Sequence, residues 1–442
     1  MHLLRKFLLM AALFFAASIA PASGAQNAPV NTAAQQNEKA NAEQNVQSVL
    51  GRLAQQPAWQ HFQSFAEAGF VIDTPQGIKR FNAGQAFVPA STTKLITALL
   101  ALRHWGDAYR FKTEFYIKRT ATQNILLVKG FGDPFLVSEE LALIAQQLKQ
   151  NLMQLQISHI DAIYLDDSFY QSDLIMPGTL WSDNPYDAIP SAIAANFNTI
   201  NVKRVSRQGS IEIISAEAQT PITQTAQQFA LTHKLKSSKA LRINLGQDLS
   251  VNQRHFAELL AAFLQQESLT VGQTVANGVV DNTFQPLYSH DNSRTLADVI
   301  EPMMKYSTNF IANQLALNLA ADQFGAPANP KKVAKLYQQA LQQLFGWQDF
   351  LVEDGAGLSR QNRLSPDQLL EVLQAFKPWR YLLPQVENHV VAKSGSLIGV
   401  STLAGFYQYK NTSLPFVIMI NEQGPYRLRN RLARELAEFY RR

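Results

Sequence analysis

The sequence predicts a mixed α/β (α+β) protein, in which an antiparallel sheet flanked by helices is interrupted by a large inserted α/β region. Three runs of β-branched and aromatic residues follow one another closely near the C-terminus, which is typical of antiparallel strands. Stretches with helical periodicity lie before and after them. Over residues 111–285 the pattern changes to short apolar runs separated by Pro-, Asp-, Asn- and Gln-rich passages, which indicates an insertion.

The N-terminus is expected to lie outside the folded domains. Arg5 and Lys6, a following apolar run and then small residues are typical of a cleaved secretory signal over residues 1–25. An uncleaved anchor is the alternative, although the apolar run is shorter than the roughly 20 residues of a membrane span. Residues 26–47 are rich in Ala, Gln and Asn and predict a flexible leader.

The composition limits what the chain can bind. Its 442 residues are 46% hydrophobic and include no cysteine, so we expect two or three folded domains and no disulfide or thiolate chemistry. The net charge of +5 is too weak and dispersed to predict nucleic-acid binding. The basic run Arg427–Arg431 is interpreted as the solvated face of a terminal helix. No metal or other cofactor is expected, because the histidines lack metal-binding spacing.

The main domain is expected over residues 48–110 and 286–442. Its first part predicts a hairpin with a Pro/Gly turn and a buried helix that begins at Ser91 and ends near Gly106. Its second part predicts a helix with Ser365 as N-cap. Further helices are predicted over 296–305, 310–324, 330–344 and 429–440, and strands over 390–393, 402–409 and 416–420.

The inserted domain, residues 111–285, is expected to carry a smaller subdomain near residues 205–247. Predicted strands cover 111–117, 125–128, 162–165, 211–214 and 241–245, and predicted helices cover 138–150 and 254–265.

Ser91 and Lys94 stand three positions apart at the start of the first predicted helix, where side chains with that spacing lie side by side. The Lys94 amine can then take the Ser91 proton, provided that burial or a second cation lowers its pKa. The free N–H groups of a helix N-terminus favour an oxyanion on the group that Ser91 attacks. A structural alternative is that Ser91 only caps the helix, because short motifs recur by chance.

Two later stretches offer partners for this pair. At a helix junction, Ser307 is expected to pass a proton to a leaving amine, and Asn309 to hold the Lys94 amine or a substrate amide. At the end of a strand, Lys393 is expected to remain a cation that lowers the pKa of Lys94 and attracts a carboxylate. Helix capping and a strand-end lysine are the corresponding structural alternatives.

The three residues after Lys393 are expected to bind substrate. Ser394 would hydrogen-bond the carboxylate, and Gly395, which has no Cβ, would let a substrate backbone approach the strand. The Ser396 N–H would complete an oxyanion hole with the Ser91 N–H.

The order Ser-x-x-Lys, Ser-x-Asn, Lys-Ser-Gly is that of serine β-lactamases and penicillin-binding proteins. Most of the mature chain resembles the class C low-molecular-mass penicillin-binding proteins, the D-alanyl-D-alanine carboxypeptidase/endopeptidases of the penicillin-binding protein 4 type. Ser394 and Ala356 stand where that family usually has Thr and Ser, and neither change removes a catalytic atom. The resemblance is carried by Pro89–Lys94, Gly132–Pro134, Pro190–Ala192 with Asn196 and Asn198, Ser307–Asn309, Asp354–Arg360 and Ala392–Leu397.

This resemblance implies a penicillin-binding/β-lactamase-like transpeptidase fold and a periplasmic enzyme that cleaves peptidoglycan stem peptides through a Ser91 acyl-enzyme. It implies β-lactams as covalent inhibitors and membrane contact that is at most peripheral, and it leaves the oligomeric state open. A serine β-lactamase is one alternative, although no stretch matches its usual glutamate loop. A non-catalytic peptidoglycan-binding protein is the other, although the chain keeps both nucleophile and base.

Overall fold

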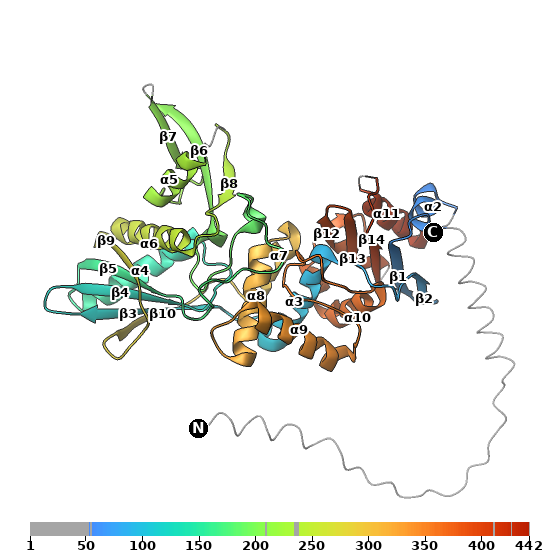
Figure 1. Cartoon of the computed structure of the whole chain (residues 1–442), viewed down its shortest axis with the longest axis horizontal. Helices are drawn as coiled ribbons and strands as arrows, with labels where there is room; N and C mark the ends of the chain where they lie inside the picture. The colour runs from blue at the N-terminus through green and yellow to red at the C-terminus, as the bar shows by residue number, and fades with distance from the viewer. Residues whose placement is uncertain are drawn as a thin grey trace, which may run out of the picture. The chain divides into compact units, whose positions relative to one another are not determined.

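The computed structural model describes residue 53 and residues 55–207, 210–233, 238–409, 412–425 and 427–441. The expected signal over residues 1–25 and the expected leader over residues 26–47 lie outside these ranges. Three sheets with associated helices make up the described part of the chain (Figure 1). None of the helices formed by these residues has the length and apolar character of a membrane span.

The main sheet has six antiparallel strands in the order β11-β12-β13-β14-β1-β2. The sheet joins strands from both ends of the chain, because β1 pairs with β14. The antiparallel sheet flanked by helices that the sequence predicted is therefore confirmed. The strands are β1 (Ala68–Thr74), β2 (Gly77–Phe81), β11 (Gln385–Glu387), β12 (Val390–Leu397), β13 (Val400–Tyr409) and β14 (Thr412–Ile420).

Helices cover both faces of this sheet, because alternate strand residues point to opposite sides. Phe416 and Ile418 of β14 pack in one core with α2 and α11, whereas Val417 and Met419 pack in another with α3, α8 and α10. Figure 1 shows the sheet between these two groups of helices. The helices of the main domain are α2 (Pro57–Gln63), α3 (Lys94–Trp105), α7 (Leu296–Tyr306), α8 (Asn309–Phe324), α9 (Pro330–Phe345), α10 (Pro366–Phe376) and α11 (Leu428–Arg441), with the 3-10 turns η1 (Ala90–Thr93) and η4 (Lys377–Leu382).

The inserted region contains a mixed five-stranded sheet in the order β10-β3-β4-β5-β9, in which β5 runs parallel to both of its neighbours. Helices α4 and α6 pack on this sheet in a separate apolar core. Strand β10 pairs with β3 and lies beyond residue 285, where we expected the insertion to end. We therefore propose the boundary after Asp291. The elements are β3 (Lys112–Arg119), β4 (Asn124–Gly130), α4 (Ser138–Gln154), β5 (His159–Asp166), α6 (Leu249–Gln266), β9 (Thr270–Asn277) and β10 (Gln285–Asp291).

A third, three-stranded sheet in the order β7-β6-β8 packs with helix α5 around its own small core. We propose that this unit is the subdomain expected near residues 205–247 and that it begins at Thr199, the first residue of β6. Two short turns, η2 (Pro185–Asp187) and η3 (Asn196–Asn198), precede it. Its elements are β6 (Thr199–Arg207), β7 (Ser210–Ser215), α5 (Gln224–Thr232) and β8 (Leu241–Asn244).

Candidate active site

Ser91 lies in the turn η1 and not in the α-helix itself, which begins at Lys94. The preceding residue, Ala90, has a φ of 48°, a left-handed conformation that costs free energy for a residue with a side chain and is concentrated at functional sites. The Pro89 carbonyl accepts hydrogen bonds from the hydroxyls of Thr92 at 2.6 Å and Thr402 at 2.8 Å. The second bond ties the turn to β13 and fixes the position of Ser91.

Lys94 connects the three parts of the site. Its Nζ donates to the Ser91 hydroxyl at 3.1 Å, to Asn309 Oδ1 at 2.8 Å and to the Ala356 carbonyl at 2.7 Å. The structure thus brings Ser91, Lys94 and Asn309 together, and Asn309 holds the Lys94 amine, one of the two partners that the sequence left open.

The surroundings of Lys94 favour its neutral form. The side chain is fully buried, and this desolvation lowers its pKa well below the ordinary value. The nearby Lys393 lowers the pKa further, whereas the Asp354 carboxylate acts in the opposite direction. A neutral amine that contacts a hydroxyl is able to accept its proton.

The Gly-rich loop that holds Ala356 is shaped by a buried carboxylate. The Asp354 carboxylate accepts hydrogen bonds from the backbone N–H groups of Ala356 at 3.1 Å and Leu358 at 2.9 Å. These bonds turn the loop toward the nucleophile. Gly357 has a φ of 78°, and a Cβ at this position would overlap the Ala90 carbonyl. The glycine therefore allows the loop to pack against the turn that carries Ser91.

Ser307 and Lys393 form a second hydrogen-bonded pair in the site. Ser307 ends α7 in the left-handed conformation, and its hydroxyl accepts a hydrogen bond from Lys393 Nζ at 2.9 Å. Lys393 also donates to the Ser394 carbonyl at 2.7 Å. Burial, together with the neighbouring Arg429 guanidinium, lowers the pKa of Lys393 to about 7. With this pKa, Lys393 carries its positive charge below about pH 7 and loses it above, whereas the sequence predicted a cation throughout.

Strand β12 presents a free edge beside these groups. Strand β11 pairs only with Val390 and Val391, so within the described residues β12 has no strand partner on that side from Lys393 onward. An extended peptide can add to such an edge through main-chain hydrogen bonds. A Cβ on Gly395 would overlap Thr402 Oγ1 and lie 2.9 Å from the Ser91 nitrogen. This glycine therefore lets β12 approach the nucleophile, and not only the substrate as we expected.

Arg429 belongs to the site, although we did not predict it from the sequence. Its guanidinium donates to the Gly395 carbonyl and, at 2.8 Å, to the Ser396 hydroxyl. The interpretation of the basic run as a solvated helix face is wrong for this residue. Helical spacing could have indicated that Arg429 faces the protein. It directly follows buried Leu428 and lies three positions before buried Leu432, so it borders the buried face of the helix.

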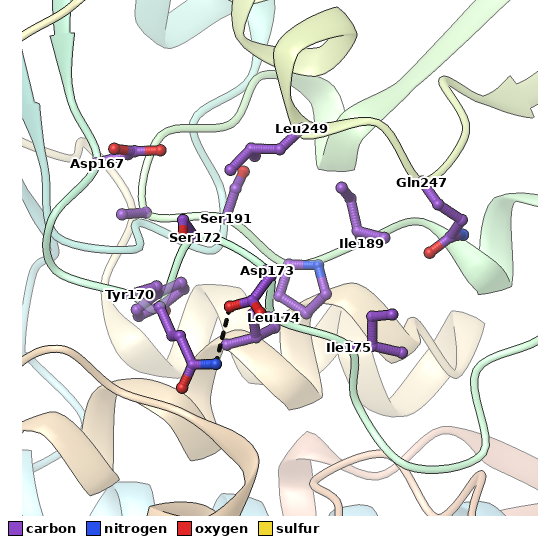
Figure 2. A pocket seen from close by; sticks show the side chains of 13 residues that line it. Asp167, Tyr170, Ser172, Asp173, Leu174, Ile175, Ile189, Ser191, Gln247 and Leu249 are labelled. Atoms are coloured by element: carbon purple, nitrogen blue, oxygen red, sulfur yellow. Dashed lines mark hydrogen bonds between the residues drawn. The ribbon is translucent and has the colours of Figure 1, made fainter.

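A separate cavity of 160 Å³ lies between Leu174–Ile175, Ile189–Ala192 and Gln247. Asp167 lines one end of it, and the side chains of Gln171 and Asp173 form a hydrogen bond of 2.8 Å beside it (Figure 2). None of the predicted site residues lines this cavity. Among the residues that the structure describes, no group of three or more histidine or acidic side chains is arranged to hold a metal ion.

Comparison with known proteins gives consistent matches. The family description D-Ala-D-Ala carboxypeptidase 3 (S13) matches residues 46–384. The D-alanyl-D-alanine carboxypeptidase DacB of Haemophilus influenzae is 26% identical over 417 residues, which cover 80% of this chain and 85% of that protein. The D-alanyl-D-alanine carboxypeptidase of Actinomadura sp. (strain R39) is 25% identical and is covered to 80%, with 84% of this chain aligned. The crystal structure of penicillin-binding protein 4 from Haemophilus influenzae matches with a TM-score of 0.68 at 21% identity, over 88% of this chain and 99% of that chain.

Proposed function

Because the chain belongs to the D-Ala-D-Ala carboxypeptidase 3 (S13) family, it is a penicillin-binding, serine-type D-alanyl-D-alanine carboxypeptidase, and we propose how its residues divide the reaction. The observation that carries the assignment is the 3.1 Å hydrogen bond between the buried Lys94 amine and the Ser91 hydroxyl. A nucleophile and its base must lie within this distance for the proton to move as the new bond forms.

In the first half of the reaction, the Ser91 oxygen bonds to the carbonyl carbon of the penultimate D-alanine while its proton moves to Lys94. The oxyanion is stabilised by the N–H groups of Ser91 and Ser396. The carbon–nitrogen bond then breaks, and the amine of the terminal D-alanine takes up the proton that Lys94 accepted, which Ser307 relays. Lys94 is neutral again when the terminal D-alanine has left. Water hydrolyses the Ser91 ester in the second half, with Lys94 again as base.

The substrate backbone lies along the free edge of β12, beside Gly395. Its terminal carboxylate accepts hydrogen bonds from the hydroxyls of Ser394 and Ser396. Lys393 and Arg429 supply the positive charge. Lys393 donates a hydrogen bond to the Ser394 carbonyl and Arg429 donates one to the Ser396 hydroxyl, so both cations lie beside the carboxylate.

The physiological substrates we infer are peptidoglycan stem peptides, both at free D-Ala-D-Ala ends and at cross-links, and the compartment is the periplasm after removal of residues 1–25. The N-terminal signal pattern supports export. β-Lactams act as covalent inhibitors, and a β-lactam is bound in a crystal structure of the related penicillin-binding protein 4 from Haemophilus influenzae.

A fluorescent penicillin tests the assignment. We expect the purified chain to form a stable covalent adduct on Ser91 and to release D-alanine from a peptide that ends in D-Ala-D-Ala. Rapid turnover of the penicillin would instead identify a β-lactamase, and the absence of any adduct would identify a non-catalytic binding protein.

A further inference from the structure

The backbone of residues 87–90, which leads into the nucleophile, is held by distant parts of the chain. Phe87 and Leu364 exchange two backbone hydrogen bonds of 2.9 and 3.0 Å. The side chain of Asn421, which directly follows β14, accepts a hydrogen bond of 2.7 Å from the Val88 N–H and donates one of 3.2 Å to the Val88 carbonyl. The approach to the nucleophile is therefore fixed from two sides.

The next two residues are held by hydroxyl groups around a strained position. Ala90 has a φ of 48°, and its carbonyl accepts a hydrogen bond of 2.9 Å from the Thr93 hydroxyl. The preceding carbonyl, that of Pro89, accepts hydrogen bonds from the hydroxyls of Thr92 at 2.6 Å and Thr402 at 2.8 Å. A strained conformation persists only where the surrounding structure fixes it, and three hydroxyl groups do so here.

The same carbonyls determine the direction of the Ser91 N–H, one of the two oxyanion donors proposed above. In a trans peptide the C=O and N–H groups point in opposite directions. Because the Ala90 carbonyl faces Thr93, the Ser91 N–H faces away from Thr93. No group among the described residues accepts a hydrogen bond from this N–H. It is thus available to an oxyanion as long as Ala90 keeps its conformation.

Thr402 connects this turn with the strand that carries the second donor, Ser396. On β13, Thr402 lies directly opposite Gly395 of β12, and Ser396 lies opposite Ser401. A Cβ on Gly395 would overlap the Thr402 hydroxyl and lie 2.9 Å from the Pro89 carbonyl oxygen. The missing side chain of Gly395 therefore leaves room for the hydrogen bond between Thr402 and Pro89.

We propose that Thr402 is a positioning residue that sets the spacing of the two oxyanion donors, the N–H groups of Ser91 and Ser396, an inference that rests on the proposed function. Its backbone pairs with β12 beside Ser396, and its hydroxyl holds the turn that carries Ser91. Thr402 is fully buried, so it acts through these backbones and not by contact with the substrate. The donors of an oxyanion hole must lie roughly 2.7–3.1 Å from the oxyanion, so a small change in their spacing lowers the rate.

The test replaces the hydroxyl with a methyl group of similar size in Thr402→Val. The Pro89 carbonyl keeps its hydrogen bond from Thr92, so this buried oxygen retains a partner. We expect the variant to slow acylation by penicillin and release of D-alanine by about tenfold, less than the roughly 10²–10³-fold loss that removal of one oxyanion donor causes. Thr402→Ser keeps the hydroxyl and should restore most of the rate.

Three further measurements separate positioning from general support of the fold. A boronic acid analogue of the substrate bonds to the Ser91 oxygen and places a boron-bound oxygen between the two donors, so Thr402→Val should weaken its binding by about the factor that acylation loses. Non-covalent peptide binding, measured in a Ser91→Ala background, should stay within about twofold. The rising limb of the acylation pH profile should not move, because the charges that shift the pKa of Lys94 are unchanged.

Thr74→Val is the matched control. Thr74 is a buried threonine of the same sheet, and its hydroxyl donates to the Gly77 carbonyl at 2.8 Å. It lies on β1, which β13 and β14 separate from β12, so its loss should leave acylation within about twofold of the parent. Melting temperatures measure the effect of both variants on stability.

Acylation at the parent rate in Thr402→Val would overturn the inference, and so would a Thr402→Ser variant that is equally slow. A shifted pH profile would also overturn it, because the effect would then act through Lys94. If Thr402→Val does not fold, Thr402→Ala takes its place with the same expected results. Absence of a penicillin adduct in the parent protein would overturn the proposed function itself, and this inference with it.

Discussion

The start of helix α3 and the middle of strand β12 present two buried lysines in similar ways, although the sequence predicted that the strand would end at Lys393. Lys94 and Lys393 each donate to a serine hydroxyl and to a backbone carbonyl, at distances between 2.7 and 3.1 Å. Burial lowers the pKa of both amines. Their neighbours differ, since Lys94 has the Asp354 carboxylate nearby and Lys393 has the Arg429 guanidinium. The comparison shows that burial makes each lysine a possible base, so contact with Ser91 decides which one accepts its proton.

Of the two lysines, Lys94 contacts Ser91 and Lys393 contacts Ser307. Removal of the Ser91 nucleophile should have the largest effect. We expect Ser91→Ala to abolish the penicillin adduct and D-alanine release together, because the variant lacks the hydroxyl that Lys94 contacts. Its melting temperature should stay close to that of the parent, since the change removes one small half-buried group. Intact-mass spectrometry measures the adduct. A penicillin adduct on this variant would contradict the assignment of Ser91.

The next effect separates the two lysines directly. Lys94→Ala should slow acylation by roughly 10²–10⁴-fold, the contribution of a general base, while non-covalent peptide binding persists. Stopped-flow acylation and equilibrium binding measure the two quantities. Lys305→Ala is the control, because Lys305 is exposed and hydrogen-bonds no residue of the site in the described structure. If Lys393→Ala slowed acylation more than Lys94→Ala, the base would have been assigned to the wrong lysine.

The pH dependence of Lys393→Ala tests the coupling between the two regions. The positive charge of Lys393 lowers the pKa of Lys94, so its removal should raise that pKa. A base must be unprotonated, so the rising limb of the acylation profile should move to higher pH and part of the rate should return there. An acylation profile identical to that of the parent would show that Lys393 acts only in binding.

The smallest effect should come from Arg429→Gln. Arg429 lowers the pKa of Lys393, so the variant should raise this pKa above about 7. Lys393 is charged below its pKa, so the fall in kcat/KM at high pH should move to higher pH. The lost guanidinium should also raise KM for peptides with a free terminal carboxylate by about tenfold, but not for the corresponding amides. Equal effects on acid and amide would argue against a role in carboxylate binding.

The elements that the sequence predicted are those whose signals are local. The helix with Ser365 as N-cap is present with a reciprocal capping box, in which Gln368 and Ser365 each hydrogen-bond the backbone of the other. The sequence missed α2, α5, β6, β9, β10 and β11. Strand β10 contains Pro286 and lies at a sheet edge, and Gly272 interrupts β9 where its register with β5 shifts. Edge strands with such residues lack the regular alternation that identifies a strand.

For the site, the sequence by itself determined the pairing of Ser91 with Lys94, because residues three positions apart at the start of a helix meet without help from the rest of the chain. It also supplied the order of the three motifs and hence the family. Only the tertiary structure decided that Asn309 binds Lys94 while Ser307 binds Lys393, and that Arg429 reaches the end of β12. These contacts join residues between 33 and 215 positions apart in the chain. Their geometry depends on how helices and sheet pack, which no local pattern encodes.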